Sequence, residues 1–288
     1  MTRKQCQHAA RQAAGRKIRA SASNPPPTGR HCPLSSQYLE KPGALAHMCI
    51  MHIPHLHDWT VTPREAIALQ KQLAGQLVLD RPLDLSAIRH VAGVDVSVRE
   101  GLSRAAVVVL SFPDLQVVET VLADAPTPFP YVPGLLTFRE GPVLEEAFAR
   151  LETEPDAFIF DGAGCAHPRG IGVASHMGLW LGRPSVGCAK TRLTGWSAGP
   201  GPSQGEVAAL LARSPTSAEP APPCIGAVLR TRANVAPVYV SPGHLVDQAS
   251  AVALVSACLS RFRLPEPVRA AHRAAALTAA SQPAFPGL

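Results

Sequence analysis

Residues 91–112 read VAGVDVSVREGLSRAAVVVLSF, and this stretch decides the fold class. β-branched residues dominate two runs, Val91–Val98 and Ala105–Phe112, which a short Gly-containing turn separates. Pro113-Asp114 then precedes a third such run, Leu115–Leu122. Closely spaced β-branched runs divided by Gly and Pro turns are typical of antiparallel strands. The stretch therefore predicts a three-stranded antiparallel meander that opens a sheet.

Outside the meander, helical and strand patterns alternate. Thr62-Pro63-Arg64-Glu65 combines an N-cap residue, a proline at the first helical position and an early acid, and predicts a helix over 62–79. Further helices are predicted over 143–152, 170–181 and 246–260, with a short one at 205–213 inside the Pro- and Gly-rich segment 197–223. Strands are predicted over 157–160, 185–189, 225–231 and 237–241. A meander followed by such alternation predicts an α/β domain with a mixed sheet flanked by helices.

The charge is distributed unevenly along the chain. The net charge is +6, but residues 1–50 hold eight Lys and Arg against one acid, which leaves 19 basic and 20 acidic residues from 51 onward. The basic excess therefore belongs to the N-terminal segment and does not indicate what the core binds. We expect a basic, Pro-containing extension over 1–56, either disordered or a mis-set start, a single domain over 57–275 and a C-terminal tail over 276–288.

Cysteine usage and hydropathy narrow the class of protein. The seven cysteines are scattered, odd in number and without a CxxC pair, which argues against a disulfide framework and a thiolate zinc site. The longest apolar run, Ala105–Leu110, is far shorter than the roughly 20 residues that span a bilayer. We therefore expect a cytoplasmic protein that does not insert into membranes. No heptad or edge-pairing segment indicates an oligomer, so a monomer is expected.

Three acidic residues carry the candidate chemistry. Asp95 lies within an apolar run, and Asp161 follows a short buried strand, where open α/β sheets place their ligands. Glu140 lies at the amino end of the helix predicted over 143–152. Each acid alone is more typical of a salt bridge or a helix cap. Together they predict a site for Mg²⁺, with Mn²⁺ as a substitute, because buried carboxylates need a counter-charge and these ions prefer carboxylate oxygens.

Three basic residues lie on turns or at strand ends farther along the chain. His167 lies on the Gly-rich turn after Asp161, Lys190 ends the strand predicted over 185–189, and His244 follows Ser241-Pro242-Gly243. Alone, each is more often structural or solvated, but we expect the first two to point toward the same rim. A histidine trio near the start of the domain lacks helical ligand spacing and is excluded as a metal site: His52, His55 and His57.

A Pro-rich aromatic loop, Phe129-Pro130-Tyr131-Val132-Pro133-Gly134, has no regular pattern. Two prolines restrict φ and Gly134 permits a sharp turn, so the loop is expected to be rigid. One interpretation is a buried aromatic loop. The other is a wedge pushed between bases, because an inserted aromatic ring stabilises an unstacked step. The residues alone leave both open.

Seven blocks of the sequence, taken in order, resemble the endonuclease V family. They are VAGVDV at 91–96, PYVPGLLTFREGP at 130–142, DGAGCAHPR at 161–169, GVASH at 172–176, VGCAK at 186–190, SPGH at 241–244 and LPEPVR at 264–269. The resemblance covers residues 57–273. It implies a ribonuclease-H-like fold and a catalytic domain, with Asp95, Glu140 and Asp161 as metal-binding acids.

The resemblance also implies roles for the other blocks. Tyr131, with Pro130 and Pro133, would form a strand-separating wedge, while Lys190, His167 and His244 would line the cleavage site. The pocket for a flipped hypoxanthine would consist of Gly134, Leu136, Gly162, Gly164, Gly172 and Val173. The implied activity is a nick in DNA at the second phosphodiester bond 3′ to a deaminated base, leaving a 3′-hydroxyl and a 5′-phosphate.

Some positions depart from the family pattern. Many members carry a larger polar residue where Ala163 stands, and the composition of 197–223 is particular to this chain. Asp247 is a candidate additional acid. Two alternative functions are a non-catalytic lesion-binding module, against which the intact acids argue, and a ribonuclease for inosine-containing RNA, which shares the chemistry.

Overall fold

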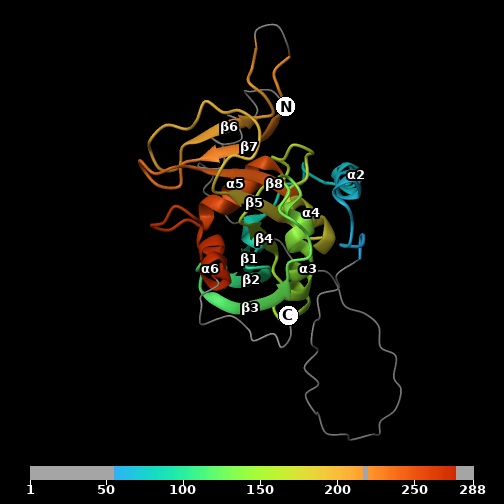
Figure 1. The fold of residues 1–288 in the computed structure, drawn as a ribbon. Coiled ribbons are helices and arrows are strands. Elements are labelled where there is room, and N and C mark those ends of the chain that lie inside the picture. The colour runs from blue at the N-terminus through green and yellow to red at the C-terminus, as the bar shows by residue number, and fades with distance from the viewer. Residues whose placement is uncertain (1–54, 217–219, 277–288) are drawn as a thin grey trace, which may run out of the picture.

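The computed structural model describes residues 55–216 and 220–276, and these form one eight-stranded sheet with helices on both faces (Figure 1). The strand order is β3-β2-β1-β4-β5-β8-β7-β6. The predictions for the extension up to residue 54 and for the tail from residue 277 lie outside the described residues. None of the helices in the described part of the chain is long and apolar enough to cross a membrane.

The strands divide into a meander, a parallel centre and an antiparallel extension. The meander is β1 (His90–Arg99), β2 (Leu102–Ser111) and β3 (Val117–Pro126). Parallel to β1 run β4 (Ala157–Phe160) and β5 (Ser185–Ala189). The antiparallel extension is β8 (Val238–His244), β7 (Cys224–Leu229) and β6 (Val207–Leu211). The predicted mixed sheet and its ribonuclease-H-like arrangement are confirmed.

Two pairs of helices cover the sheet. α3 (Leu136–Ala149) and α4 (Val173–Leu181) pack on one face, and α5 (Gln248–Ala257) and α6 (Glu266–Ala275) on the other (Figure 1). Each face has its own apolar cluster because side chains alternate along the strands: Val94 belongs to the α3 side and Val91 to the α6 side. α2 (Pro63–Ala74) packs apart from the sheet, against Phe129 and Phe138. A 3-10 turn (Leu85–Ala87) precedes β1.

Three helix predictions need correction, and one helix was not predicted. Residues 205–213 contain β6 instead of a helix, because pairing with β7 outweighs the helical propensity of Ala and Leu. α2 ends at Ala74, where Gly75 caps it, and not at 79. α3 begins at Leu136 and contains Pro142, although Gly141-Pro142 suggested a start at 143. α6 was not predicted, because Pro265 and Pro267 interrupt the local pattern although both fit a helix start.

Candidate active site

Asp95 and Asp161 lie together because their strands are neighbours. β1 and β4 run parallel with Val94 opposite Phe160, and the backbone N–H of Asp161 donates to the Val94 carbonyl at 2.9 Å. Both carboxylates are largely buried, with side-chain exposures of 13% for Asp95 and 8% for Asp161. The structure therefore brings these two predicted acids side by side, one on β1 and the other directly after β4, in the interior of the sheet.

Glu140 reaches the same cleft from α3. It lies within that helix and not at its amino end, so a helix cap does not explain it. The three acids line one narrow cleft. Its other walls are apolar and consist of Val94, Val96, Leu144, Phe160 and Val173. The apolar walls keep the carboxylates in a poorly solvated environment.

Burial and mutual repulsion raise the pKa of two of these acids. Burial raises the pKa of Glu140 to about 8, and the neighbouring carboxylates of Asp95 and Asp161 add to the shift. Burial and then Asp161 raise the pKa of Asp95, against the hydrogen bond from His272 and the charge of Lys190. Carboxylates in this situation either hold a proton or gather positive charge. The cleft therefore favours a cation.

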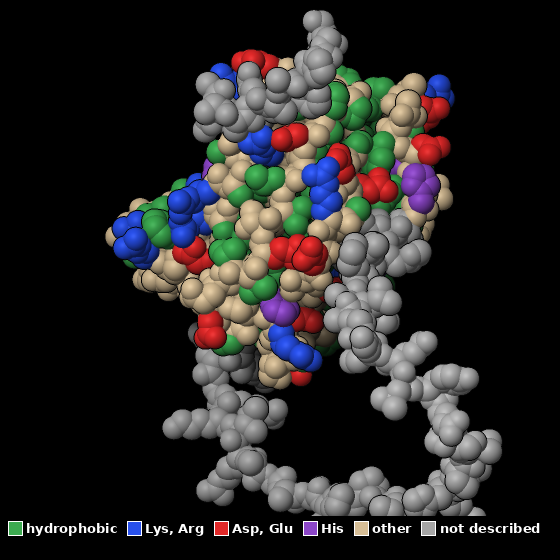
Figure 2. Space-filling view, turned by 90° about the horizontal axis from the view of Figure 1, so that it is seen from below, with side chains coloured by type: hydrophobic (Ala, Val, Ile, Leu, Met, Phe, Trp, Pro, Cys, Tyr) green, Lys and Arg blue, Asp and Glu red, His purple; other side chains and the backbone are tan. Residues whose placement is uncertain are grey.

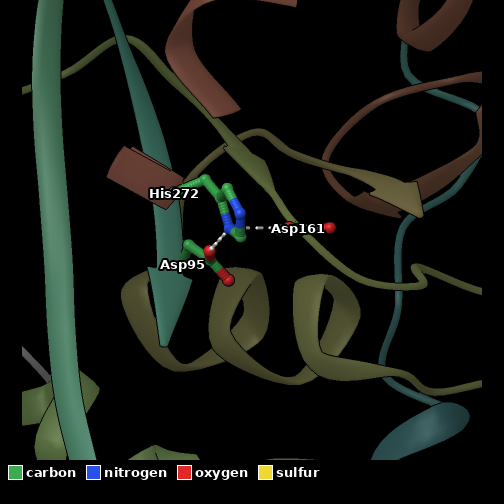
Figure 3. Close-up of side chains that lie close together, drawn as sticks. All are labelled: Asp95, Asp161 and His272. Carbon is green, nitrogen blue, oxygen red and sulfur yellow. Dashed lines mark hydrogen bonds and ion pairs between the residues drawn. The ribbon is translucent and has the colours of Figure 1, made fainter. Parts of the chain in front are cut away.

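Two basic side chains face the carboxylates. Lys190, which follows β5, forms an ion pair with Asp161 Oδ2 and lies 3.2 Å from Nδ1 of His272. His272 of α6 places Nδ1 2.7 Å from Asp95 Oδ2 and 4.0 Å from Asp161 Oδ2 (Figure 3). Figure 3 shows the imidazole ring between the two carboxylates. Among the described residues, the donor atoms of Asp95, Asp161 and His272 lie within 4.8 Å of one another, as ligands of one metal ion do.

Gly93 allows α6 to bring His272 this close. A Cβ on Gly93 would lie 1.9 Å from the carbonyl oxygen of Pro267, so the helix start rests directly on the β1 backbone. Val268, Ala271 and the rest of the buried stripe of α6 then pack on the sheet. His272 is consequently held beside Asp95, two residues beyond Gly93 on the same face of the strand.

His167 is engaged away from the acidic cleft. It is 6% exposed, its Nε2 lies 3.0 Å from the Gly134 carbonyl oxygen, and its Nδ1 accepts the N–H of Arg169 at 3.2 Å. Burial, with a smaller contribution from Arg169, lowers its pKa to about 4. His167 is thus a neutral ring with both nitrogens occupied, and it is not among the residues that line the cleft.

His244 and Asp247 are also separated from the acids. His244 pairs with Ser185, the first residue of β5, whereas Lys190 follows the last residue of that strand. The His244 Nδ1 accepts the N–H of Val78 at 3.3 Å. Asp247 caps α5 by accepting the N–H of Ser250 at 2.7 Å. A capping role accounts for this candidate additional acid.

Four of the six residues predicted for a base pocket lie in the segment 161–173 that joins β4 to α4, hereafter the glycine turn: Gly162, Gly164, Gly172 and Val173. Gly172 donates its N–H to the Gly164 carbonyl at 2.9 Å, and a Cβ on Gly172 would lie 2.3 Å from the Ala163 oxygen. A Cβ on Gly162 would lie 2.4 Å from Val173 Cγ1. Larger residues do not fit this turn, so backbone groups form its surface. His167 connects this turn to Gly134 through its contact with the Gly134 carbonyl oxygen. Leu136, two residues after Gly134, is the first residue of α3.

The loop at residues 130–134, hereafter the wedge loop, is exposed at its centre. Tyr131 is 70% exposed, and Pro130 and Pro133 are exposed beside it. Phe129, by contrast, is buried against Phe138, and its carbonyl oxygen accepts from Arg139 at 3.2 Å. The interpretation of a wholly buried aromatic loop is therefore wrong: the loop presents an aromatic ring to solvent.

Charge is not concentrated in one broad patch on the face that Figure 2 presents. Figure 2 shows Lys and Arg side chains interspersed with Asp and Glu over the face that it presents. This agrees with the near balance of charge from residue 51 onward. Recognition of an anionic partner would therefore depend on local groups such as Lys190.

Sequence comparison places these residues in a family. The family model for endonuclease V matches residues 71–273, a range that contains Asp95, Glu140, Asp161, Lys190 and His272. The chain belongs to the endonuclease V family. An endonuclease V from Methanothrix thermoacetophila is 44% identical over 217 residues, which cover 75% of this chain and 92% of the relative.

Solved endonuclease V structures share the fold. The crystal structure of Streptomyces avermitilis endonuclease V is 39% identical, with a TM-score of 0.69, and the match covers 75% of this chain and 92% of that one. Ciona intestinalis endonuclease V, solved in complex with a 23mer DNA containing an inosine followed by a ribo-adenosine, has a TM-score of 0.62 at 24% identity. That match covers 75% of this chain and 97% of the other. At such an identity the likeness is one of fold.

His272 is the residue of this endonuclease V site that the sequence reasoning missed. The block LPEPVR at 264–269 was noted, but it stops three residues before His272. A helix beginning at Glu266 would have placed His272 and Arg269, three positions apart, on one helix face. The available signal was thus the proline-led helix start at Glu266, together with a histidine six residues later, which is about one and two-thirds turns along the helix.

Proposed function

We propose that this protein is a divalent-metal-dependent endonuclease that nicks DNA beside a deaminated base such as hypoxanthine, with residues 57–275 as the catalytic domain. The observation that carries the proposal is the convergence of Asp95, Glu140 and Asp161 in one cleft. The raised pKa of Glu140 and of Asp95 supports a cation in this cleft, because burial and mutual repulsion of the carboxylates disfavour their charged forms. Family membership supports the activity.

The donor set fits a hard divalent cation. Asp95, Glu140 and Asp161 would hold it, with His272 as a nitrogen donor, and carboxylate-dominated sites favour Mg²⁺ with Mn²⁺ as a substitute. When bound, such an ion supplies charge that stabilises the phosphate in the transition state and acidifies water.

The remaining side chains act on phosphate and on the position of the substrate. Lys190, whose side chain is 33% exposed, would bind a phosphate oxygen of the substrate, because its partner Asp161 would serve as a metal ligand. His167 would hold the wedge loop, because both of its ring nitrogens have backbone partners. His244 would support the site from the far end of β5. The catalytic set then comprises the three acids, Lys190 and His272.

Substrate selection would rest on the wedge loop and the glycine turn. The fold is shared with a protein solved on inosine-containing DNA. Tyr131 would enter the duplex, flanked by Pro130 and Pro133, while the base enters a pocket formed by Gly134, Leu136, Gly162, Gly164, Gly172 and Val173. Extruding a base costs a few kcal/mol, and less when it is mispaired, which favours inosine mismatches. The proposed product is a nick at the second phosphodiester bond 3′ to the lesion, with a 3′-hydroxyl and a 5′-phosphate.

The direct test uses end-labelled duplexes with one deoxyinosine or none, in Mg²⁺ or EDTA, with product lengths read on a denaturing gel. We expect a nick only with inosine and Mg²⁺, at the stated bond. Inosine DNA that is bound but uncut would instead indicate a lesion-binding module. A parallel inosine-containing RNA strand tests the ribonuclease alternative, which predicts faster cleavage of RNA than of DNA.

A further inference from the structure

Three side-chain donors converge on the carbonyl oxygen of Gly134, at the end of the wedge loop. The donor distances are 3.0 Å from Gln70 Nε2, 3.0 Å from His167 Nε2 and 2.6 Å from Arg169 Nη2. Gly134 has a φ of +78°, and a Cβ there would lie 2.6 Å from Nη2 of Arg169. The conformation of Gly134 and its three contacts hold this end of the loop in one place.

Gln70 is the member of this network that lies outside every motif noted in the sequence. Its side chain on α2 is 1% exposed. Besides Gly134, its Nε2 faces the Ile171 carbonyl oxygen at 3.5 Å, and its Oε1 accepts from Arg169 Nε at 2.5 Å. The amide uses both its donor and its acceptor, so no apolar or purely accepting side chain can replace it without a buried unpaired group. Gln70 thereby connects α2, the wedge loop and the glycine turn.

Tyr131 projects between two anchored ends of the loop. At one end Phe129 packs with Ala66 and Phe138, and at the other end Gln70 holds Gly134. The exposed ring of Tyr131 therefore stands on a short, proline-stiffened support whose position is set by α2. A preorganised group of this kind avoids the entropic cost of ordering when substrate binds.

We propose that Gln70 is a positioning residue that sets the wedge loop against the glycine turn, so that Tyr131 enters the duplex where the pocket receives the base. This inference rests on the proposed function. Gln70 is not among the residues that line the acidic cleft, and its effect passes through Gly134 and Arg169. Its loss should impair opening of the duplex and leave bond cleavage intact.

The experiment compares Gln70→Glu with Gln72→Glu. The first change keeps the acceptor for Arg169 and removes both donors, and the second makes the same charge change at an exposed position of the same helix. Single-turnover nicking is measured on an inosine duplex and on the inosine strand alone. The fluorescence of 2-aminopurine beside the inosine, in EDTA, reports unstacking. For Gln70→Glu we expect a duplex rate lower by roughly tenfold, a single-strand rate within about twofold and a smaller fluorescence rise.

Each outcome decides the inference. Equal losses on duplex and single strand, or a duplex preference matching that of Gln72→Glu, would overturn it. If the wild-type protein leaves inosine DNA uncut, the proposed function fails, while the fluorescence comparison in EDTA still decides the role of Gln70. If thermal melting shows that Gln70→Glu does not fold, Arg169→Lys tests the same link, because it keeps the charge and loses the paired contacts. The same duplex-selective loss is expected there, and its absence counts against the inference.

Discussion

The imidazole Nδ1 of His272 lies 2.7 Å from Oδ2 of Asp95, although 177 positions separate the two residues along the chain. α6 makes this contact because Gly93 admits the backbone of Pro267 against β1. The contact joins the last described helix to the strand that opens the sheet. It completes a group of nitrogen and oxygen donors that could hold one cation.

Replacing His272 should weaken the metal-dependent reaction. We expect His272→Ala to lower Mg²⁺-dependent nicking by roughly 10- to 100-fold or more, because loss even of a group that only orients a metal ligand costs that much. His55→Ala is the matched control, because His55 is similarly exposed and also pairs with an aspartate, Asp58, which does not line the acidic cleft. Rates are measured over a Mg²⁺ titration. An equal decrease in nicking rate in both variants would show that His272 does not belong to the metal site.

Asp161 should be required for both metal binding and cleavage. We expect Mn²⁺ to raise the melting temperature of the wild-type protein, since an ion at 100 times its dissociation constant contributes about 2.7 kcal/mol. Asp161→Asn should abolish this shift and the nicking, whereas Asp114→Asn, at an exposed turn, should retain both. Full Mg²⁺-dependent nicking by Asp161→Asn would show that the metal assignment is wrong.

The exposed ring of Tyr131 should matter for duplex substrates. Base–aromatic stacking contributes about 1–3 kcal/mol, so Tyr131→Ala should lower nicking of an inosine duplex by roughly tenfold or more. Nicking of a single strand should fall far less, and Tyr131→Phe should restore the duplex rate because it keeps the ring. Gel assays on both substrates measure the ratio, and an unchanged ratio would contradict a wedge.

Stability should decline in mild acid because of a contact between two histidines, one of which, His176, is fully buried. Nε2 of His57 lies 2.7 Å from Nε2 of His176, and burial, with His57 nearby, lowers the pKa of His176 to about 3. The titratable groups that act on this pair are His55, Asp58 and Glu145, all on the His57 side. Folding therefore keeps the His176 ring neutral. This costs no folding free energy at a pH where His176 is also neutral in the unfolded chain, but it costs free energy where the unfolded chain would protonate it.

The sign of the pH dependence follows from that depressed pKa. The free energy of unfolding is unaffected by His176 above pH 6.5, the ordinary pKa of histidine, and it decreases as the pH falls from there toward 3. At pH 5 the loss amounts to about 2 kcal/mol, from 1.36 kcal/mol per pH unit. Urea unfolding at pH 7 and pH 5 measures it. His176→Gln should show a smaller difference between the two pH values than the wild type, and an equal difference would refute the assignment.

Much of the fold could be predicted from local patterns. The meander, β4, β5, β7 and β8 follow from β-branched runs and turns, because these preferences act between near neighbours. β6 could not be predicted in this way, since only its pairing with β7 makes residues 207–211 a strand. The bounds of α2 and α3 likewise depend on which of their side chains pack into an apolar cluster.

The candidate site likewise contains residues that the sequence predicts and contacts that only the tertiary structure sets. The sequence by itself determined that Asp95 sits within a buried strand, that Asp161 directly follows another, and that a proline-stiffened aromatic loop precedes Glu140. Only the tertiary structure decided that His272 joins the acids, that His167 and His244 are occupied elsewhere, and that Gln70 holds the wedge loop. The physical reason is that strand ends follow from local hydrophobic pattern, whereas contacts between distant segments depend on how closely backbones pack, as Gly93 and Pro267 show.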